Sequence, residues 1–261
     1  MALKGKNIVI VGGTSGMGLS ACQACIQAGA KVSTFGRNAE KVERSKKILG
    51  NQATIAVGNA TDPNMVSSVI DRFVAKQGII HGLYHVAGGS GRSMGDAPLH
   101  EVTDKGWYKT IELNLTSMFY SNRAAVRQFL RQKTRGSILN MGSVLGFSPS
   151  SRYFGMLTYA TAKSAIIGMT KSSASFYADQ GIRFNVIAPA LVDTPMAERA
   201  STDQKIMQYI QTKQPLDGGR IGLPSDLNQA VVFFLSDASK FVTGQVLAID
   251  GGWSISEGQY L

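Results

Sequence analysis

Tyr159 and Lys163 are the residues of this chain whose types and spacing best suit acid–base chemistry. They lie four positions apart in the stretch Tyr159-Ala-Thr-Ala-Lys163, so on a helix both side chains share one face, a turn apart. A lysine ammonium group beside a phenol favours the phenolate and lowers a pKa that is about 10 in water. We therefore expect a phenol that gives a proton to a carbonyl oxygen, or takes one from an alcohol, near neutral pH.

A glycine-rich turn near the start of the chain supplies a second chemical signal. It follows an apolar stretch, opens a segment of helical character and reads Gly12-Gly-Thr-Ser-Gly16-Met17-Gly18. Gly12 permits a tight turn, Gly16 lets the backbone approach a pyrophosphate, and Gly18 allows close contact between helix and strand. The helix N-terminus then offers free N–H groups and the positive end of its dipole to phosphates. A nucleotide site and an acid–base pair in one small protein indicate redox chemistry.

These groups must be positioned by the alternating strands and helices that fill the chain, an alternation typical of a parallel sheet covered on both faces. Apolar runs predict strands at 7–11, 31–35, 53–57, 80–87, 137–141, 183–188 and 246–249. Helical patterns and cap residues predict helices at 16–28, 38–49, from 62 onward, 103–133, 157–178, 198–211 and 224–236. We expect one doubly wound domain over residues 1–261.

The stretch 190–223 interrupts this rhythm with a polar helix between prolines and glycines. Loops of this length in a compact domain are usually functional. In an open α/β sheet the ligand crevice lies beyond the carboxyl ends of the strands, and the stretch leaves such an end. We therefore expect a substrate lid here; a packing or oligomer contact is the alternative.

Composition narrows the function further. The chain has 261 residues, 44% of them apolar, which suffices for one large α/β domain. No run of eighteen apolar residues occurs, and the start, Met1-Ala-Leu-Lys-Gly-Lys-Asn7, lacks the apolar region of a signal peptide. We expect a cytoplasmic protein with no membrane partner. Two cysteines, Cys22 and Cys25, and three scattered histidines make a poor zinc set, so we expect buried structural thiols and no metal.

The formal net charge of +10 raises the question of a nucleic-acid partner. Its lysines and arginines are dispersed along two expected helices without interleaved aromatic residues, so no nucleic-acid partner is expected. A basic field of this kind instead favours anionic cofactors or substrates.

From Val11 to Trp253 the residues resemble the single-domain short-chain dehydrogenase/reductase family. Its motifs are met in order by the glycine turn, Asn114 in the long helix, Asn140-Met-Gly-Ser143, Tyr159-x-x-x-Lys163 and Pro189-Ala-Leu-Val-Asp-Thr194. The resemblance implies a Rossmann-type sheet of seven strands, an NADP(H) or NAD(H) cofactor, a small carbonyl or alcohol substrate and a homotetramer.

The resemblance also implies roles for individual residues. Tyr159 is then the general acid of reduction, Lys163 lowers the pKa of Tyr159 and binds the nicotinamide ribose, Ser143 polarises the carbonyl, and Asn114 holds a water in a proton relay or ties a helix bulge. Thr194 steadies the carboxamide. The implied cofactor-binding residues are Gly12, Thr14, Ser15, Gly16, Met17, Gly18, Arg37, Asn59, Ala60, Ala87, Gly88, Tyr159, Lys163, Pro189, Val192 and Thr194.

The chain departs from the family pattern at three places. His85-Val-Ala-Gly88 replaces Asn-Asn-Ala-Gly, so the contacts of the asparagines need another source. Asn59-Ala60 replaces the Asp–hydrophobe pair that meets adenine, and an amide still accepts and donates there. Ser143 and Tyr159 lie 16 positions apart, more than is usual, so we expect the stretch 145–157 to bulge outward.

The cofactor preference is predicted from the end of the second strand. An NAD-selective member has Asp where this chain has Gly36, and no acid occurs between Lys31 and Ala39. Arg37 is able to bind a 2′-phosphate through its planar fork. We therefore expect NADP(H) to be preferred over NAD(H), although neither Thr14 nor Ser15 supplies the second basic residue of many NADP-dependent relatives.

The expected activity is interconversion of a ketone and a secondary alcohol. In the related enoyl reductases, six residues separate the catalytic tyrosine from the lysine. The position that corresponds to that tyrosine is Met156 here. Alternatives are a catalytically weak cofactor-binding sensor or scaffold and a 3-oxoacyl thioester reductase. Residues expected to line an apolar pocket are Leu145, Phe147, Phe154, Met156, Leu191 and Met196. Arg92 and Arg152 are expected to face solvent; the alternative is that they receive a carboxylate, phosphate or acyl-carrier thioester.

Overall fold

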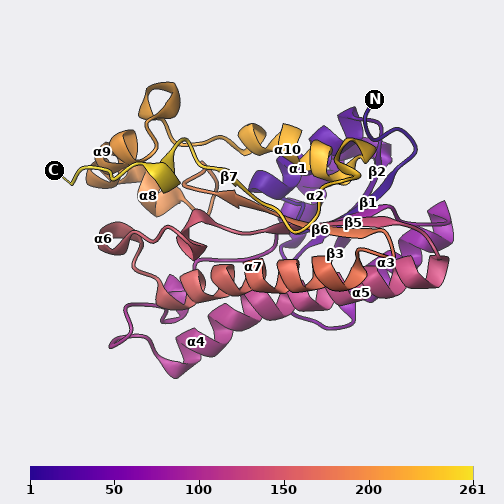
Figure 1. Ribbon diagram of the computed structural model, residues 1–261, viewed down its shortest axis with the longest axis horizontal. Helices are drawn as coiled ribbons and strands as arrows, with labels where there is room; N and C mark the ends of the chain where they lie inside the picture. Colours follow the sequence, from indigo (N-terminus) through magenta and orange to yellow (C-terminus); the bar gives the residue numbers. More distant parts are fainter. Residues whose placement is uncertain (261) are drawn as a thin grey trace.

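Seven parallel strands form one sheet within residues 1–260, the part of the chain that the computed structural model describes (Figure 1). Their bounds are β1 Asn7–Val11, β2 Lys31–Gly36, β3 Ala53–Val57, β4 Gly82–His85, β5 Gly136–Met141, β6 Ile182–Pro189 and β7 Val246–Ile249. The spatial order is β3-β2-β1-β4-β5-β6-β7. The strand order reverses between β1 and β4, which places the ligand crevice of a doubly wound sheet above these two strands. The predicted doubly wound sheet is confirmed.

Helices cover both faces of the sheet and bury an apolar core on each (Figure 1). One layer contains α1 (Gly16–Gln27), α2 (Ala39–Leu49) and α10 (Asn228–Leu235). The other contains α3 (Met65–Gln77), α5 (Ser117–Gln132) and α7 (Leu157–Tyr177). Strand residues are apolar in succession because both faces are covered, as for Ile8, Val9 and Ile10, which are all fully buried.

Two expected element boundaries are wrong, the first because a polar side chain holds a turn there. The third helix begins at Met65 rather than at Asp62, since the Asp62 carboxylate accepts the Asn64 N–H (2.9 Å) and the Asp62 carbonyl accepts the Met65 N–H. The strand expected at 80–87 is limited to β4.

The stretches expected as single helices at 198–211 and 224–236 are also divided. The first consists of α8 (Glu198–Thr202) and α9 (Gln204–Lys213), because the Asp203 carboxylate caps α9 at its Lys205 and Ile206 N–H groups. In the second, a 3₁₀ turn at Pro224–Leu227 precedes α10.

The long helix expected at 103–133 is interrupted by a π-helical turn. Thr103 caps α4 (Asp104–Ile111), residues Glu112–Thr116 form the π turn, and α5 follows directly. One extra residue in a helical turn rotates the side chains that follow, and such turns are frequent at functional sites.

The stretch 145–157 combines exposed residues, among them Phe147 and Arg152, with buried ones. It forms a 3₁₀ turn at Val144–Gly146 and the short helix α6 (Ser151–Phe154). Phe154 and Met156 are buried against α9 and Trp253, where they form a third apolar cluster beside the main cores. The additional residues therefore build a wall between the sheet and the 190–223 insertion.

Cys22 and Cys25 are free, buried thiols on α1, as predicted. Burial raises the pKa of both, that of Cys25 to about 12. Among residues 1–260, no helix is both long and apolar enough to cross a membrane.

Candidate active site

The glycine turn after β1 is as tightly packed as its spacing predicts. Gly12 has φ +89°, and a Cβ atom there would lie 2.9 Å from the Ala87 backbone nitrogen. A Cβ at Gly18 would collide with the Gly12 carbonyl. Gly16, at φ +51°, starts α1 directly below Thr194. The turn therefore brings backbone, rather than side chains, to the crevice above β1 and β4.

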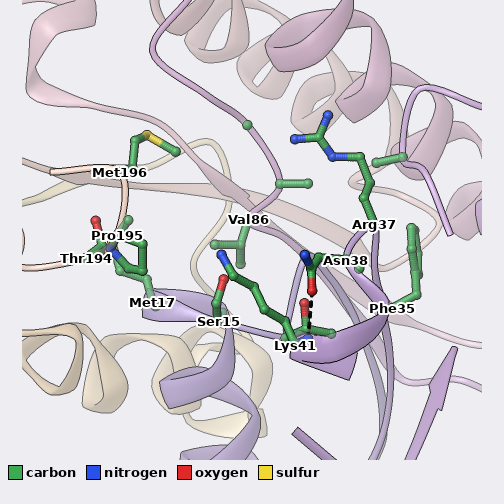
Figure 2. Close-up of a pocket in the computed structure, with 18 of the residues that line it drawn as sticks. Ser15, Met17, Phe35, Arg37, Asn38, Lys41, Val86, Thr194, Pro195 and Met196 are labelled. Carbon is green, nitrogen blue, oxygen red and sulfur yellow. Dashed lines mark hydrogen bonds between the residues drawn. The ribbon is translucent and has the colours of Figure 1, made fainter. Parts of the chain in front are cut away.

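A cavity of about 360 Å³ opens above this turn, between the start of α1 and the start of α2 (Figure 2). It is lined by most of the residues predicted to bind a cofactor: Gly12, Thr14, Ser15, Gly16, Met17, Gly18, Arg37, Asn59, Ala60, Ala87, Gly88 and Thr194. Pro189 and Val192 line a second cavity instead. A side chain at Gly36 would collide with Thr14, so this position leaves no room for an acidic residue in the observed arrangement.

Lys41 is a cavity residue that our sequence reasoning missed. It lines the cavity together with Arg37, and Figure 2 shows its side chain extending from α2 toward the side of Ser15. The Asn38 side chain, the predicted N-cap, accepts the Lys41 N–H at 2.8 Å and so fixes the first turn of α2. The position of Lys41 in the first turn of the helix predicted to begin at Asn38 was the available signal. The cavity thus has two basic side chains at its α2 end.

The second cavity, of about 310 Å³, brings together Asn114, Ser143, Tyr159 and Lys163. Ser143 follows β5, while Tyr159 and Lys163 lie on α7. The Ser143 hydroxyl oxygen accepts the Leu145 N–H at 3.2 Å, which leaves its own O–H free to donate. The two cavities adjoin, because both are lined by Met17, Val86, Gly88, Thr194 and Met196.

The electrostatics of the Tyr159–Lys163 pair differ from our expectation. Burial raises the pKa of Tyr159, and only its interaction with the Ser143 hydroxyl lowers it. Burial also lowers the pKa of Lys163 to about 7. The Lys163 ammonium group lies 5.4 Å from the centre of the Tyr159 ring and donates to the Met141 carbonyl at 2.9 Å. Desolvation outweighs charge attraction here, because neither group has another charge close enough to offset its loss of hydration.

A family model described as enoyl-(acyl carrier protein) reductase matches residues 11–254. The chain belongs to the short-chain dehydrogenase/reductase family. It is therefore an oxidoreductase of the short-chain dehydrogenase/reductase type, and the resemblance found in the sequence is confirmed.

Several relatives of this short-chain dehydrogenase/reductase are dehydrogenases or reductases by name. The 3-oxoacyl-(acyl-carrier-protein) reductase FabG of Thermotoga maritima is 33% identical over 255 residues, 97% of this chain and 99% of the relative. The 2-(S)-hydroxypropyl-CoM dehydrogenase 3 of Xanthobacter autotrophicus is 31% identical over 96% of this chain and 97% of its own. A solved short-chain dehydrogenase/reductase from Mycobacterium ulcerans superposes with a TM-score of 0.88 at 28% identity, covering 99% of this chain and 93% of the other.

Asn114 ties the π turn of this short-chain dehydrogenase/reductase to the cavity floor. Its amide nitrogen donates to the carbonyls of Thr110 and Gly89, both at 2.9 Å, and its oxygen accepts the Gly89 N–H at 3.2 Å. Thr110 lies four positions earlier, near the end of α4. A Cβ at Gly88 would lie 2.7 Å from the Asn114 oxygen, so only glycine fits there. Asn114 thus supports the floor of the cavity beside Lys163.

His85 supplies the contacts for which the altered Asn-Asn-Ala-Gly motif needed a source. Its Nδ1 lies 2.7 Å from the Ser121 hydroxyl on α5, and its Nε2 lies 3.0 Å from the Ala87 carbonyl. Burial, the nearby Lys163 charge and the contact with the Ala87 carbonyl set its pKa at about 3, the first two lowering it and the third raising it. A neutral imidazole therefore links the end of β4 to α5 beneath the cavity.

Asp96 is a positioning residue that the motifs did not reveal. It is buried, and its two carboxylate oxygens accept the N–H groups of Thr158 (2.8 Å) and Tyr159 (2.9 Å) at the start of α7. An acidic cap in the first turn of a helix satisfies N–H groups that have no intrahelical partner. Asp96 therefore fixes the backbone that carries the phenol.

The remainder of the second cavity is largely apolar. Five of the six predicted lining residues are found there: Leu145, Phe154, Met156, Leu191 and Met196. Phe147 is exposed and does not line it. Arg92 lines the cavity, whereas Arg152 lies outside, with its guanidinium over the rings of Tyr153 and Tyr260. Arg199 also lines the cavity and was not singled out in the sequence.

Proposed function

We propose that this protein interconverts a ketone and a secondary alcohol with NADP(H) as cofactor and Tyr159 as general acid and base. The observation that carries the proposal is the convergence of Ser143, Tyr159 and Lys163 on one cavity that adjoins the glycine turn. The bound cofactor supplies the hydride for the carbonyl carbon. Tyr159 gives its phenolic proton to the carbonyl oxygen, and Ser143 donates a hydrogen bond to the oxygen as negative charge develops on it.

Lys163 and Asn114 act on this proton transfer from below the phenol. Lys163 lies beside the Tyr159 ring, and anionic cofactor phosphates nearby would favour its charged form. A charged Lys163 in turn favours the Tyr159 phenolate, which is the state that accepts a proton from an alcohol. Asn114 lines the cavity and is hydrogen-bonded to Gly89 on its floor, where we propose that it holds a water for a proton relay.

The residues of the first cavity fit a dinucleotide with a 2′-phosphate. Gly12 and Gly18 allow the close packing of the turn that Gly16 needs to bring backbone to a pyrophosphate, and Thr194 lies against Gly16. Arg37 and Lys41 both line this cavity, and no acidic residue among residues 1–260 does. Arginine binds phosphate through a planar fork and lysine as a point charge. These features support NADP(H) over NAD(H).

The insertion at 190–223 is proposed as the substrate lid. Leu191, Met196 and Arg199 from this stretch line the second cavity, and α9 packs on the wall formed by Phe154 and Met156. Closure of such a segment excludes water from the hydride transfer.

Carbonyl reduction is favoured over reduction of a carbon–carbon double bond, although the matching family model carries an enoyl reductase description. The position of the enoyl reductase tyrosine is Met156, whose buried thioether has no proton to give. A 3-oxoacyl thioester reductase remains an alternative substrate class, because relatives at 31–33% identity are named FabG. A cofactor-binding sensor would need no complete acid–base set, and here the four candidate positions share one cavity.

Replacing the phenol tests the proposal directly. In Tyr159→Phe we expect NADPH-dependent ketone reduction to fall by about a hundredfold or more, since general acid catalysis contributes roughly that factor. NADPH binding, measured by fluorescence, should change little. Tyr177→Phe, on the same helix but outside both cavities, is the matched control and should keep its rate. Wild-type turnover in Tyr159→Phe would refute the mechanism.

A further inference from the structure

Two arginines from distant segments meet at the second cavity. Arg92 belongs to the 3₁₀ turn Arg92–Met94 after β4, and Arg199 belongs to α8 in the insertion. Nη2 of Arg92 donates to the Tyr153 carbonyl at 2.7 Å, and Nη2 of Arg199 donates to the same oxygen at 3.2 Å. Both side chains line the cavity that also holds Ser143 and Tyr159.

No carboxylate lies in ion-pair contact with these two arginines among the described residues. Both oxygens of the nearby Asp96 are engaged by the start of α7. A guanidinium group carries five N–H donors, of which the shared carbonyl engages one from each arginine. Partial burial and the Arg199 charge lower the pKa of Arg92, whereas Asp96 raises it. The two guanidinium groups share only a neutral acceptor, the Tyr153 carbonyl. Their positive charges and their remaining N–H donors are therefore available to an anion.

The geometry points to a substrate with an oxyanion group, a carboxylate or sulfonate, bound by Arg92 and Arg199 while its ketone lies at Ser143 and Tyr159. This assignment rests on the proposed function, because it places the anion in the cavity where the ketone is reduced. Leu145, Phe154 and Met156 line the same cavity, so an apolar chain is the fitting link between the two polar ends. A bound anion would also connect the insertion to the rest of the domain, because Arg199 lies in the insertion and Arg92 lies outside it.

Binding without turnover tests the anion site separately from catalysis. The probes are 4-oxopentanoate, 5-oxohexanoate, 6-oxoheptanoate and their methyl esters, titrated into the protein saturated with NADP⁺, which cannot deliver hydride to a ketone. We expect at least one acid to bind about tenfold to a hundredfold more tightly than its ester, the range of charge-assisted hydrogen bonds. An oxo-sulfonate of matching length should also bind more tightly than the ester if the site recognises the negative charge and not the shape of a carboxylate.

Matched variants locate the preference. Arg92→Met and Arg199→Met should each reduce the ratio of acid to ester affinity by about tenfold or more. Arg152→Met, which removes an equal charge outside the cavity, should keep the ratio.

The outcomes separate the two proposals. Equal binding of acids and esters, no binding of any acid, or a preference that survives loss of both arginines overturns the anion site. If one of these results is found but the esters are still reduced in a reaction that depends on Tyr159, the anion site is wrong and the proposed function is supported. Acid-selective binding in a protein that reduces no ketone supports the anion site and overturns the oxidoreductase proposal.

Discussion

Arg37 and Lys41 have the same charge and line the same cavity, but only Arg37 was predicted from the sequence to bind the cofactor. Arg37 was predicted from the missing acid at Gly36, whereas Lys41 resembled the solvated charges that follow it on α2. Arg37 precedes α2, whereas Lys41 lies in its first turn, and only the structure shows that both line the cavity. Charge type can thus be predicted from sequence, but the face that it occupies depends on packing.

We predict that both cations select the cofactor. Arg37→Ala and Lys41→Ala should each lower kcat/KM for NADPH by about tenfold or more, because a charge-assisted hydrogen bond to phosphate is lost. The value for NADH should change much less. Arg44→Ala, on α2 but outside the cavity, is the control. Higher wild-type catalytic efficiency with NADH than with NADPH would contradict the assignment.

Lys163 should make stability depend on pH. Its pKa falls from 10.5 to about 7 on folding, so between these values the unfolded chain holds a proton that the folded protein has released. Unfolding free energy therefore rises with pH across this window, by at most about 1.4 kcal/mol per pH unit. Urea unfolding of the cofactor-free wild type and of Lys163→Met is measured from pH 6 to 10. The unfolding free energy of the wild type should rise relative to that of the variant as the pH increases. Parallel curves would rule out a depressed lysine pKa.

At the scale of elements, Asp96 is expected to link helix capping to catalysis. Asp96→Ala removes both acceptors at the start of α7, and loss of such a cap costs about 0.5–2 kcal/mol. Turnover should fall about tenfold or more, because the backbone that carries Tyr159 loses its anchor. Thr103→Ala removes the cap of α4 and should lower the unfolding free energy similarly without a comparable loss of kcat. Equal kcat in wild type and Asp96→Ala would show that the cap is structural only.

The elements also show where sequence reasoning stopped. Short apolar runs placed every strand, because a strand buried on both faces is apolar along its length. The hydrophobic pattern did not reveal the π turn at Glu112–Thr116, since one additional residue per turn leaves the period almost unchanged; only the helix bulge implied for Asn114 by the resemblance pointed to it. The packing of 145–157 was not predicted, because its apolar residues find their partners on α9 and at Trp253, far along the chain. The raised pKa of Tyr159 likewise follows from burial, which spacing does not report.

At the scale of the whole molecule, the outer face of α7 is built for close approach to another surface. Most exposed positions on it are small, including Ser164 and Gly168; Lys171 is exposed as well, and Phe176 on the same helix is 71% exposed. The edge strand β7 is unpaired on its outer side among the described residues. Together with the family resemblance, these features predict a homotetramer related by two-fold axes.

Gly168→Arg tests that assembly without disturbing the protomer. A Cβ at Gly168 meets open space, and arginine favours a helix more than glycine does. Light scattering should give a tetramer for the wild type and a smaller species for Gly168→Arg, with an unchanged circular dichroism spectrum. A monomeric wild type, or a variant of unchanged mass, would show that α7 is not the contact.

The buried pair on α1 has a practical consequence for watching the insertion move. Maleimide dyes react with thiolates, and Cys22 and Cys25 are both shielded and hard to ionise. The chain has no further cysteine. A single thiol introduced at Lys205, exposed on α9, can therefore be labelled in the otherwise unaltered protein. Its fluorescence would report whether the insertion changes position when cofactor and substrate are added.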